Sequence, residues 1–428
     1  MRQAKLGPDH PSTLTSKSNL ASFYRQAGQY QKSLELEQNV LEMMQRKRGI
    51  DHPQTLTLMS NMAASYKLLD QIDKAVELNQ KVLELRKKKL GSNHPDTLFS
   101  MSNLAALYVH AGEFEKALAA NQEVFALQKI EIGHDHPDAL RTLSNLANSY
   151  SKLGQTDKAI ELNREALELR RTKLGSDHPE TLVSISNLAA TYSLAKQTDK
   201  AIQLNEEVLQ LRKTKLGADH PDTLKSMSDL GVSYKDADRI DEAIELLEAA
   251  FESSKGATAR HSIESKLRDA YVNGKRIEKL EKLIQRSILE TRKQTDQEGL
   301  RNQLNECGSA LFKAGSFSKA EVLLRECFDL LSEEDPNAWR TFETMSLLGA
   351  SVLEQGRYEE AKPILTSSLQ GLKTHANEIP ASQRKSQFAR IITWLIELAE
   401  AEENEKDLEK WNAARKELEV THSESDED

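Results

Sequence analysis

Residues 174–182 read LGSDHPETL, and close variants of this segment return every 42 residues along the chain. A fixed period of roughly 20–50 residues is the pattern of a solenoid, in which each repeat contacts only its neighbours. Tyrosines keep the same spacing from Tyr24 to Tyr234. The His-Pro pair of the segment lies at His10-Pro11, His52-Pro53, His94-Pro95, His136-Pro137, His178-Pro179 and His220-Pro221. This unbroken spacing predicts a repeat protein.

Each period is expected to form two helices. In the third period, Pro95 suits the first turn of a helix, where a missing N–H has no cost, and Asn93 and His94 stand where a capping residue belongs. Gly112 would end this first helix, and the second would begin near Glu115. The expected apolar stripe of the first helix follows three- and four-residue steps through Leu98, Met101, Leu104, Ala105, Tyr108 and Ala111.

The small residues and tyrosines carry a family resemblance. Leu146-Ala147 with Tyr150, Gly154 and Ala159 resembles the tetratricopeptide repeat, and the 42-residue period resembles its longer variant in kinesin light chains and bacterial multi-repeat proteins. A period of 42 would also suit HEAT or armadillo repeats, but the small-residue and tyrosine positions favour the tetratricopeptide repeat. The resemblance implies an all-α fold, a right-handed superhelical solenoid of antiparallel helix pairs whose first helices line the concave surface.

Four regions are expected along the chain. Residues 1–255 form the regular array, residues 256–383 form degenerate helix pairs, residues 384–420 form capping helices, and residues 421–428 form a disordered acidic tail. The end of the array, with Trp394 and Trp411, resembles repeat arrays attached to bacterial serine/threonine protein kinases. Because residues 2–6 match the last turn of a repeat, we expect an uncovered apolar face on the first helix pair and hypothesise that the chain is part of a longer protein.

Composition narrows the classes of partner. The formal net charge of -9 and the isoelectric point near 5.8 argue against binding to nucleic acid or to an anionic membrane surface. The two cysteines, Cys307 and Cys327, form no disulfide framework, and no apolar run approaches the roughly 20 residues of a membrane span. A soluble, cytoplasmic protein is expected.

Neither catalysis nor metal binding is indicated. The sequence lacks phosphate-loop, zinc-protease, nucleophile-elbow and protein-kinase motifs. Equivalent histidines in adjacent repeats would lie about 10 Å apart, whereas zinc needs its ligands within about 2 Å of one point. The His-Pro pairs are therefore interpreted as helix caps, and no cofactor or small-molecule substrate is expected.

The candidate peptide-binding site is a row of polar residues on the first helices. An Asn amide both donates and accepts hydrogen bonds, so a row of them could pair with an extended peptide backbone, and scattered cations could favour an acidic ligand. The alternative, that each Asn bonds to a neighbouring helix, stays open. Kinesin light chains resemble this chain in having Asn on the corresponding helix, where the groove receives short cargo peptides. The candidate residues are Asn19, Asn61, Asn103, Asn145, Asn187, Ser102, Ser144, Arg25, Lys67 and Arg141.

Two further sets of repeated residues favour structural roles. A second Asn row on the second helices is expected to face a packed neighbour. Basic clusters at the ends of second helices are expected to interact with the helix dipole rather than with RNA. These sets are Asn79, Asn121, Asn163 and Asn205, and Arg46-Lys47-Arg48, Arg86 to Lys89, Arg170-Arg171 and Arg212-Lys213.

The sequence thus predicts a noncatalytic scaffold that binds a peptide or protein segment in a concave groove. The alternatives are a regulatory or substrate-recruiting arm of a signalling enzyme such as a serine/threonine protein kinase, with its catalytic domain outside this chain, and an RNA-binding solenoid.

Overall fold

The structure, a computed structural model, describes residue 7, residues 10–293 and residues 296–420. These residues contain 20 α-helices and no strand, so the predicted all-α solenoid of paired helices is confirmed. The expected tail, residues 421–428, lies outside the described residues. The chain forms two compact units, Met1–Ser226 and Met227–Asp428, and their boundary falls within helix α12 (Pro221–Asp236).

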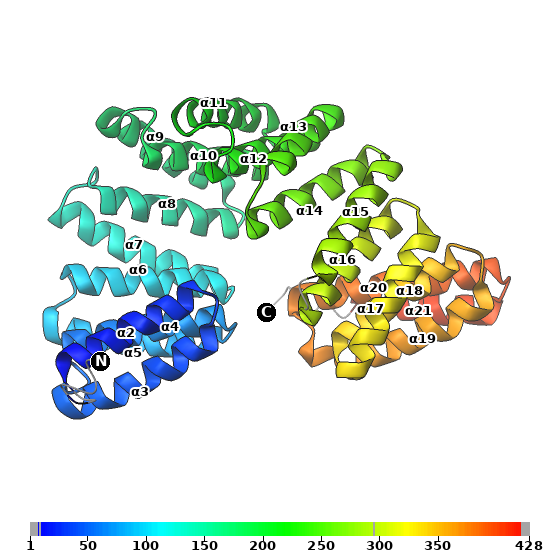
Figure 1. The fold of residues 1–428 in the computed structure, drawn as a ribbon, viewed down its shortest axis with the longest axis horizontal. Helices are drawn as coiled ribbons and strands as arrows, with labels where there is room; N and C mark the ends of the chain where they lie inside the picture. The colour runs from blue at the N-terminus through cyan, green and yellow to red at the C-terminus, as the bar shows by residue number, and fades with distance from the viewer. Residues whose placement is uncertain (1–6, 8–9, 294–295, 421–428) are drawn as a thin grey trace. The chain divides into compact units, whose positions relative to one another are not determined.

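The first unit consists of alternating first and second helices, and each helix packs on its neighbour in chain order (Figure 1). The even-numbered helices are the first helices of the repeats. In chain order, the first and second helices of this unit are α2 (Pro11–Gln26), α3 (Tyr30–Arg48), α4 (Pro53–Leu68), α5 (Ile72–Leu90), α6 (Pro95–His110), α7 (Phe114–Glu131), α8 (Pro137–Lys152), α9 (Thr156–Leu174), α10 (Pro179–Leu194) and α11 (Thr198–Leu216).

The histidine of each His-Pro pair caps a first helix. Its Nδ1 accepts a hydrogen bond from the backbone N–H two residues later. The Asp96 N–H donates to His94 with an N–Nδ1 distance of 3.1 Å, and the Glu180 N–H donates to His178 with one of 3.2 Å. An accepting side chain at this place satisfies one of the helix's free N–H groups. The cap interpretation is confirmed at His10, His52, His94, His136, His178 and His220.

The residue before the capping histidine ties the start of a first helix to the end of the second helix in the same repeat. The carboxylate of Asp177 accepts a hydrogen bond from Lys215 Nζ at 2.8 Å, and Asp51 accepts one from Lys89 at 2.9 Å. The hydrogen bond from Lys215 is the main reason that the pKa of Asp177 lies below its ordinary value. Because these pairs are exposed, each contributes little to stability.

In the turn between the two helices, one residue must adopt a left-handed backbone conformation. Gly112 has φ +77°, as expected for the residue after a helix C-terminus, because glycine adopts this region without strain. Lys196 occupies the corresponding place two repeats later with φ +57°. The predicted stop at Gly112 is therefore confirmed, and α7 begins one residue before the expected Glu115.

The second unit continues the helix pairs after the His-Pro segment has disappeared from the sequence. Its helices are α13 (Ile240–Ser253), α14 (Ala257–Asn273), α15 (Ile277–Arg292), α16 (Gln297–Lys313), α17 (Phe317–Glu334), α18 (Trp339–Leu353), α19 (Tyr358–Thr374), α20 (Ala381–Ala401) and α21 (Glu405–Val420). Glycines keep the close packing within these pairs. A Cβ on Gly308 would lie 2.7 Å from Leu324 Cγ, and one on Gly349 would lie 2.9 Å from Leu365 Cγ.

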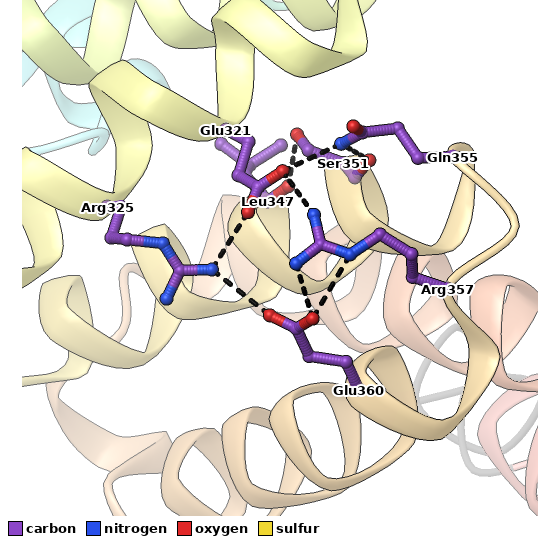
Figure 2. Close-up of polar contacts among 7 residues, drawn as sticks. All are labelled: Glu321, Arg325, Leu347, Ser351, Gln355, Arg357 and Glu360. Carbon is purple, nitrogen blue, oxygen red and sulfur yellow. Dashed lines mark hydrogen bonds and ion pairs between the residues drawn. The ribbon is translucent and has the colours of Figure 1, made fainter.

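An ion-pair network ties α17 to α19 (Figure 2). Glu321 accepts hydrogen bonds from Arg325 at 2.8 Å, from Arg357 at 2.7 Å and from Gln355 at 2.8 Å, while Glu360 bridges the two arginines. Burial alone would raise the pKa of Glu321, but the hydrogen bonds from Arg325 and Gln355 and the charge of Arg357 bring it below its ordinary value. The network therefore favours the ionised carboxylate.

Candidate peptide-binding groove

The predicted Asn row lies on successive first helices with its amides unused. Asn61, Asn103, Asn145 and Asn187 are half-buried, and Asn19 is exposed. No side-chain hydrogen bond joins any of these five amides to another of the described residues. Their polar atoms remain accessible to solvent or to a ligand, whereas an amide that registers neighbouring helices would be bonded between them.

The Ser row beside it is bonded within its own helices. Ser144 Oγ donates to the carbonyl of Leu140 at 3.1 Å and also accepts a hydrogen bond from Arg170 at 3.2 Å. Ser18, Ser60 and Ser186 likewise donate to the carbonyl four residues earlier. Ser102 makes no such hydrogen bond within the described part of the chain. Among the predicted serines, Ser102 is therefore the better ligand candidate and Ser144 the weaker one.

A groove of about 550 Å³ opens between α6, the end of α7 and the start of α8. Of the predicted site residues, Ser102 and Arg141 line this groove, and the Asn row does not. Phe99, which is 50% exposed, adds an apolar wall to this groove. The lining consists of Asn93, Pro95, Asp96, Leu98, Phe99, Ser102, Gln128, Glu131, Ile132, His136, Asp138 and Arg141.

The three predicted cations have different surroundings. Arg25 donates to Glu37 Oε1 at 3.0 Å and to the carbonyl of Asn61 at 3.1 Å, so its guanidinium is already held inside the repeat stack. Arg141 is exposed but pairs with Asp138 at 2.8 Å. Lys67 forms no ion pair with another described residue. Sequence reasoning could not separate these cases, because all three are single basic residues near the end or start of a first helix.

The carboxylate that holds Arg25 is itself buried. Glu37 on α3 is 1% exposed and accepts a hydrogen bond from Ser65 Oγ at 2.7 Å. Burial raises the pKa of Glu37 and outweighs the hydrogen bond from Ser65 and the charge of Arg25, both of which lower it. The Arg25–Glu37 pair therefore only partly offsets the cost of burying this carboxylate.

The second Asn row is buried, as expected. Asn121 donates to Ser149 Oγ at 3.2 Å and Asn163 donates to Thr191 Oγ1 at 2.9 Å, each across to the next first helix. Glu37 occupies the same place one repeat before Asn79. These contacts agree with the interpretation of this row as structural.

Three arginines within the predicted basic clusters are buried, which sequence reasoning missed. Arg86, Arg170 and Arg212 each donate to a serine on the next first helix, at 2.7 Å for Ser100 and for Ser226. Burial lowers the pKa of Arg170, with Glu180 opposing it. The available signal was the recurrence of Arg with a serine 14 residues later.

The second unit has a groove of its own, about 680 Å³ in volume, along α16, α17 and α18. Five carboxylates and two arginines line it: Glu298, Glu306, Glu334, Asp335 and Glu343 with Arg301 and Arg340. Beneath it, buried Arg268 pairs with Glu264 at 2.7 Å and with Glu306 at 2.6 Å. Cys307 is buried beside this arginine, and burial raises the pKa of its thiol to about 12.

Among the described residues, no group of His, Cys, Asp or Glu is arranged to hold a metal ion. No helix in the same residues is long and apolar enough to cross a membrane.

Stacked helix pairs with small residues at the crossing points define a helical repeat protein. Models of the tetratricopeptide repeat match residues 12–88, 58–130, 101–172 and 138–214, and a second model of the same description matches residues 223–257. Together they cover more than half of the 428 residues, and the chain belongs to the tetratricopeptide repeat proteins. These repeats make it a protein-interaction scaffold.

Solved structures include similar chains. One, from Podosopora anserina, is described as a kinesin light chain with nearly identical TPR-like repeats; it is 32% identical over 48% of this chain and 97% of its own, with a TM-score of 0.45. BtubC (BKLC) from P. vanneervenii is 21% identical over 52% of this chain and 90% of its own, with a TM-score of 0.45. The apo form of RapI is 13% identical over 85% of this chain and 98% of its own, with a TM-score of 0.48.

No curated protein matches the sequence. The resemblance of the C-terminal part to kinase-attached arrays is not shown by these matches.

Proposed function

We propose that the chain is a noncatalytic scaffold whose first helices bind an extended peptide segment of a partner protein. The observation that carries the proposal is the row of half-buried, unbonded amides at Asn61, Asn103, Asn145 and Asn187. Each amide can donate to a peptide carbonyl and accept from a peptide N–H, which recognises the backbone whatever its side chains are. The groove beside Phe99 would receive one apolar side chain of the ligand.

The proposal does not extend to an acidic ligand. Arg25 and Arg141 already pair with Glu37 and Asp138, and Asp96 and Glu131 also line the groove around Arg141. Because these carboxylates offset the basic charge, backbone recognition is the better supported mode. In the described residues, nothing favours the regulatory arm of a kinase over this scaffold.

The test uses a peptide selected on the whole chain from a random display library and labelled for fluorescence anisotropy. Replacing Asn103 and Asn145 together by Ala should raise the Kd about tenfold or more, because two ligand hydrogen bonds of about 1 kcal/mol each are lost. Thermal unfolding should change little. Asn163→Ala is the matched control, since this buried amide bonds to Thr191 and its loss should lower stability instead. Unchanged affinity in the double variant would refute the proposal.

A further inference from the structure

One repeat of the first unit has a shorter side chain where its neighbours bury an arginine. Arg86 on α5 and Arg170 on α9 stand one repeat before and one repeat after Gln128 on α7. The guanidinium of Arg86 donates to the Ser100 hydroxyl at 2.7 Å and to the carbonyl of Asp96 at 3.0 Å. A carboxamide carries fewer donors on a shorter stem, so Gln128 supplies no guanidinium at this place.

The acceptors that would meet such a guanidinium are still present. The residues equivalent to Ser100 and Asp96 one repeat later are Thr142 and Asp138. The Thr142 hydroxyl donates to the Asp138 carbonyl at 3.1 Å, but no guanidinium among the described residues donates to either group. Asp138 and Gln128 both line the groove of about 550 Å³ beside Phe99. This groove therefore borders on the place that an arginine fills in the flanking repeats.

Gln128 is a buried acceptor in the wall of that groove. It is 4% exposed, and in the described part of the chain its buried Oε1 has no hydrogen-bond partner. A carboxamide turns easily about its last torsion, so this oxygen can face the groove. A buried acceptor without a donor is unfavourable, and a ligand that supplies an N–H would remove that cost.

The groove is acidic overall. Its lining carries the carboxylates of Asp96, Glu131 and Asp138 against the single guanidinium of Arg141. Arg141 pairs with Asp138 at 2.8 Å. Glu131 accepts a hydrogen bond from the Asn93 amide at 2.8 Å but forms no ion pair with another described residue. The groove should therefore attract a cationic group and repel an anionic one.

The exposed ring of Phe99 suits the same kind of ligand group. An aromatic face attracts a guanidinium placed over it, and arginine does this more often than lysine. Arginine also buries its methylenes against apolar surface while its charged end reaches polar groups. Its planar fork can donate to a carboxamide oxygen and to a carboxylate at once, which the ammonium of lysine does less well.

We propose that this groove binds an arginine side chain of the peptide ligand, which takes the place of the guanidinium that Arg86 and Arg170 supply in the flanking repeats. The guanidinium donates to Gln128 Oε1 and to the Glu131 carboxylate, and the apolar stem packs on Phe99. The inference rests on the proposed function, because it names the side chain that the bound peptide places beside Phe99.

The test repeats the peptide selection on the whole chain and on its Gln128→Arg variant, which restores the residue of the flanking repeats. Peptides selected on the unchanged chain should share an arginine at one position, and the variant should lose this preference. In fluorescence anisotropy, replacing that arginine by citrulline, which has a similar shape but no charge, should raise the Kd at least tenfold. Gln128→Arg should weaken the arginine peptide at least tenfold and the citrulline peptide less than threefold.

A matched pair of variants tests the charge of the groove. Glu131→Gln should weaken the arginine peptide at least threefold, because it removes the unpaired carboxylate beside Gln128. Glu115→Gln removes an exposed carboxylate from the same helix outside the groove lining, and it should leave the affinity unchanged.

Two results would overturn the inference: selected peptides without a shared arginine, and an arginine peptide that binds the unchanged chain and Gln128→Arg equally well. Neither result decides the proposed function, which the Asn103 and Asn145 double variant tests separately. If the arginine peptide loses affinity in Gln128→Arg but not in that double variant, the inference stands and the Asn row is not the backbone site. A selection that yields no binder counts against both.

Discussion

Removing the guanidinium of Arg25 should expose the cost of burying Glu37. In Arg25→Ala, Glu37 keeps the hydrogen bond from Ser65 but loses its only ion pair among the described residues, at 3.0 Å. Breaking a buried pair by removing one partner costs about 3–5 kcal/mol. Because Ser65 remains and the Arg25 side chain is 17% exposed, we expect the lower end, about 3 kcal/mol.

The loss should depend on pH in a defined direction. The folded-state pKa of Glu37 is raised because burial outweighs its hydrogen bond and ion pair, so the folded protein takes up this proton more readily than the unfolded chain. Without Arg25 the pKa rises further, and the buried charge is most costly above it. The penalty should therefore be largest near pH 7 and shrink as the pH falls towards the ordinary glutamate value of about 4.3.

Hydrogen exchange measured by mass spectrometry suits this prediction, because repeat arrays lose stability locally. Arg25→Ala should raise exchange in α2, α3 and α4 and leave α8 and α9 unchanged. Lys67→Ala is the control, since Lys67 occupies the same place one repeat later without an ion pair to a described residue, and surface changes of this kind cost under about 0.5 kcal/mol. A pH-independent penalty, or equal effects of the two variants, would refute the reasoning.

Three further changes test single features. His136→Ala should lower stability by about 1 kcal/mol through loss of the cap on α8, and His136→Asn should retain most of it, as measured by the thermal midpoint. Glu321→Gln should cost about 1 kcal/mol at pH 7; because the folded-state pKa of Glu321 is lowered, this loss should fade as the pH drops through that pKa in urea titrations. Gly308→Ala should cost about 1–3 kcal/mol in the same titrations, since the new Cβ would meet Leu324 Cγ at 2.7 Å.

The fold was predictable because its signals are local and repeated. Pro95 and Gly112 mark helix ends by their own backbone preferences, and the stripe from Leu98 to Tyr108 marks the packed face. The second unit was predictable from spacing alone, because Gly308 and Gly349 keep the close approach of paired helices after the other repeated residues are lost. These features require no knowledge of which residues meet across repeats.

The candidate site was less predictable because side-chain partners depend on contacts between repeats. Arg25 was a reasonable ligand cation until the structure placed Glu37, 12 residues away, against it at 3.0 Å. Arg86 and Arg170 belonged to apparently solvated basic clusters, yet each reaches a serine on the next helix. Charge patterns along one helix do not show which long side chains turn inward.

Comparison of the two Asn rows gives the best criterion for separating structure from binding in this array. At the buried position the residue type and its bonding vary between repeats. Glu37 accepts a hydrogen bond from Ser65, Asn121 donates one to Ser149, and the buried Oδ1 atoms of Asn79 and Asn121 have no hydrogen-bond partner. Packing therefore tolerates several residue types at this position. The accessible row repeats Asn from Asn19 to Asn187 although no described residue bonds to these amides. A residue type that recurs without an internal partner needs an external one to explain it, and that argument favours the accessible row as the binding surface.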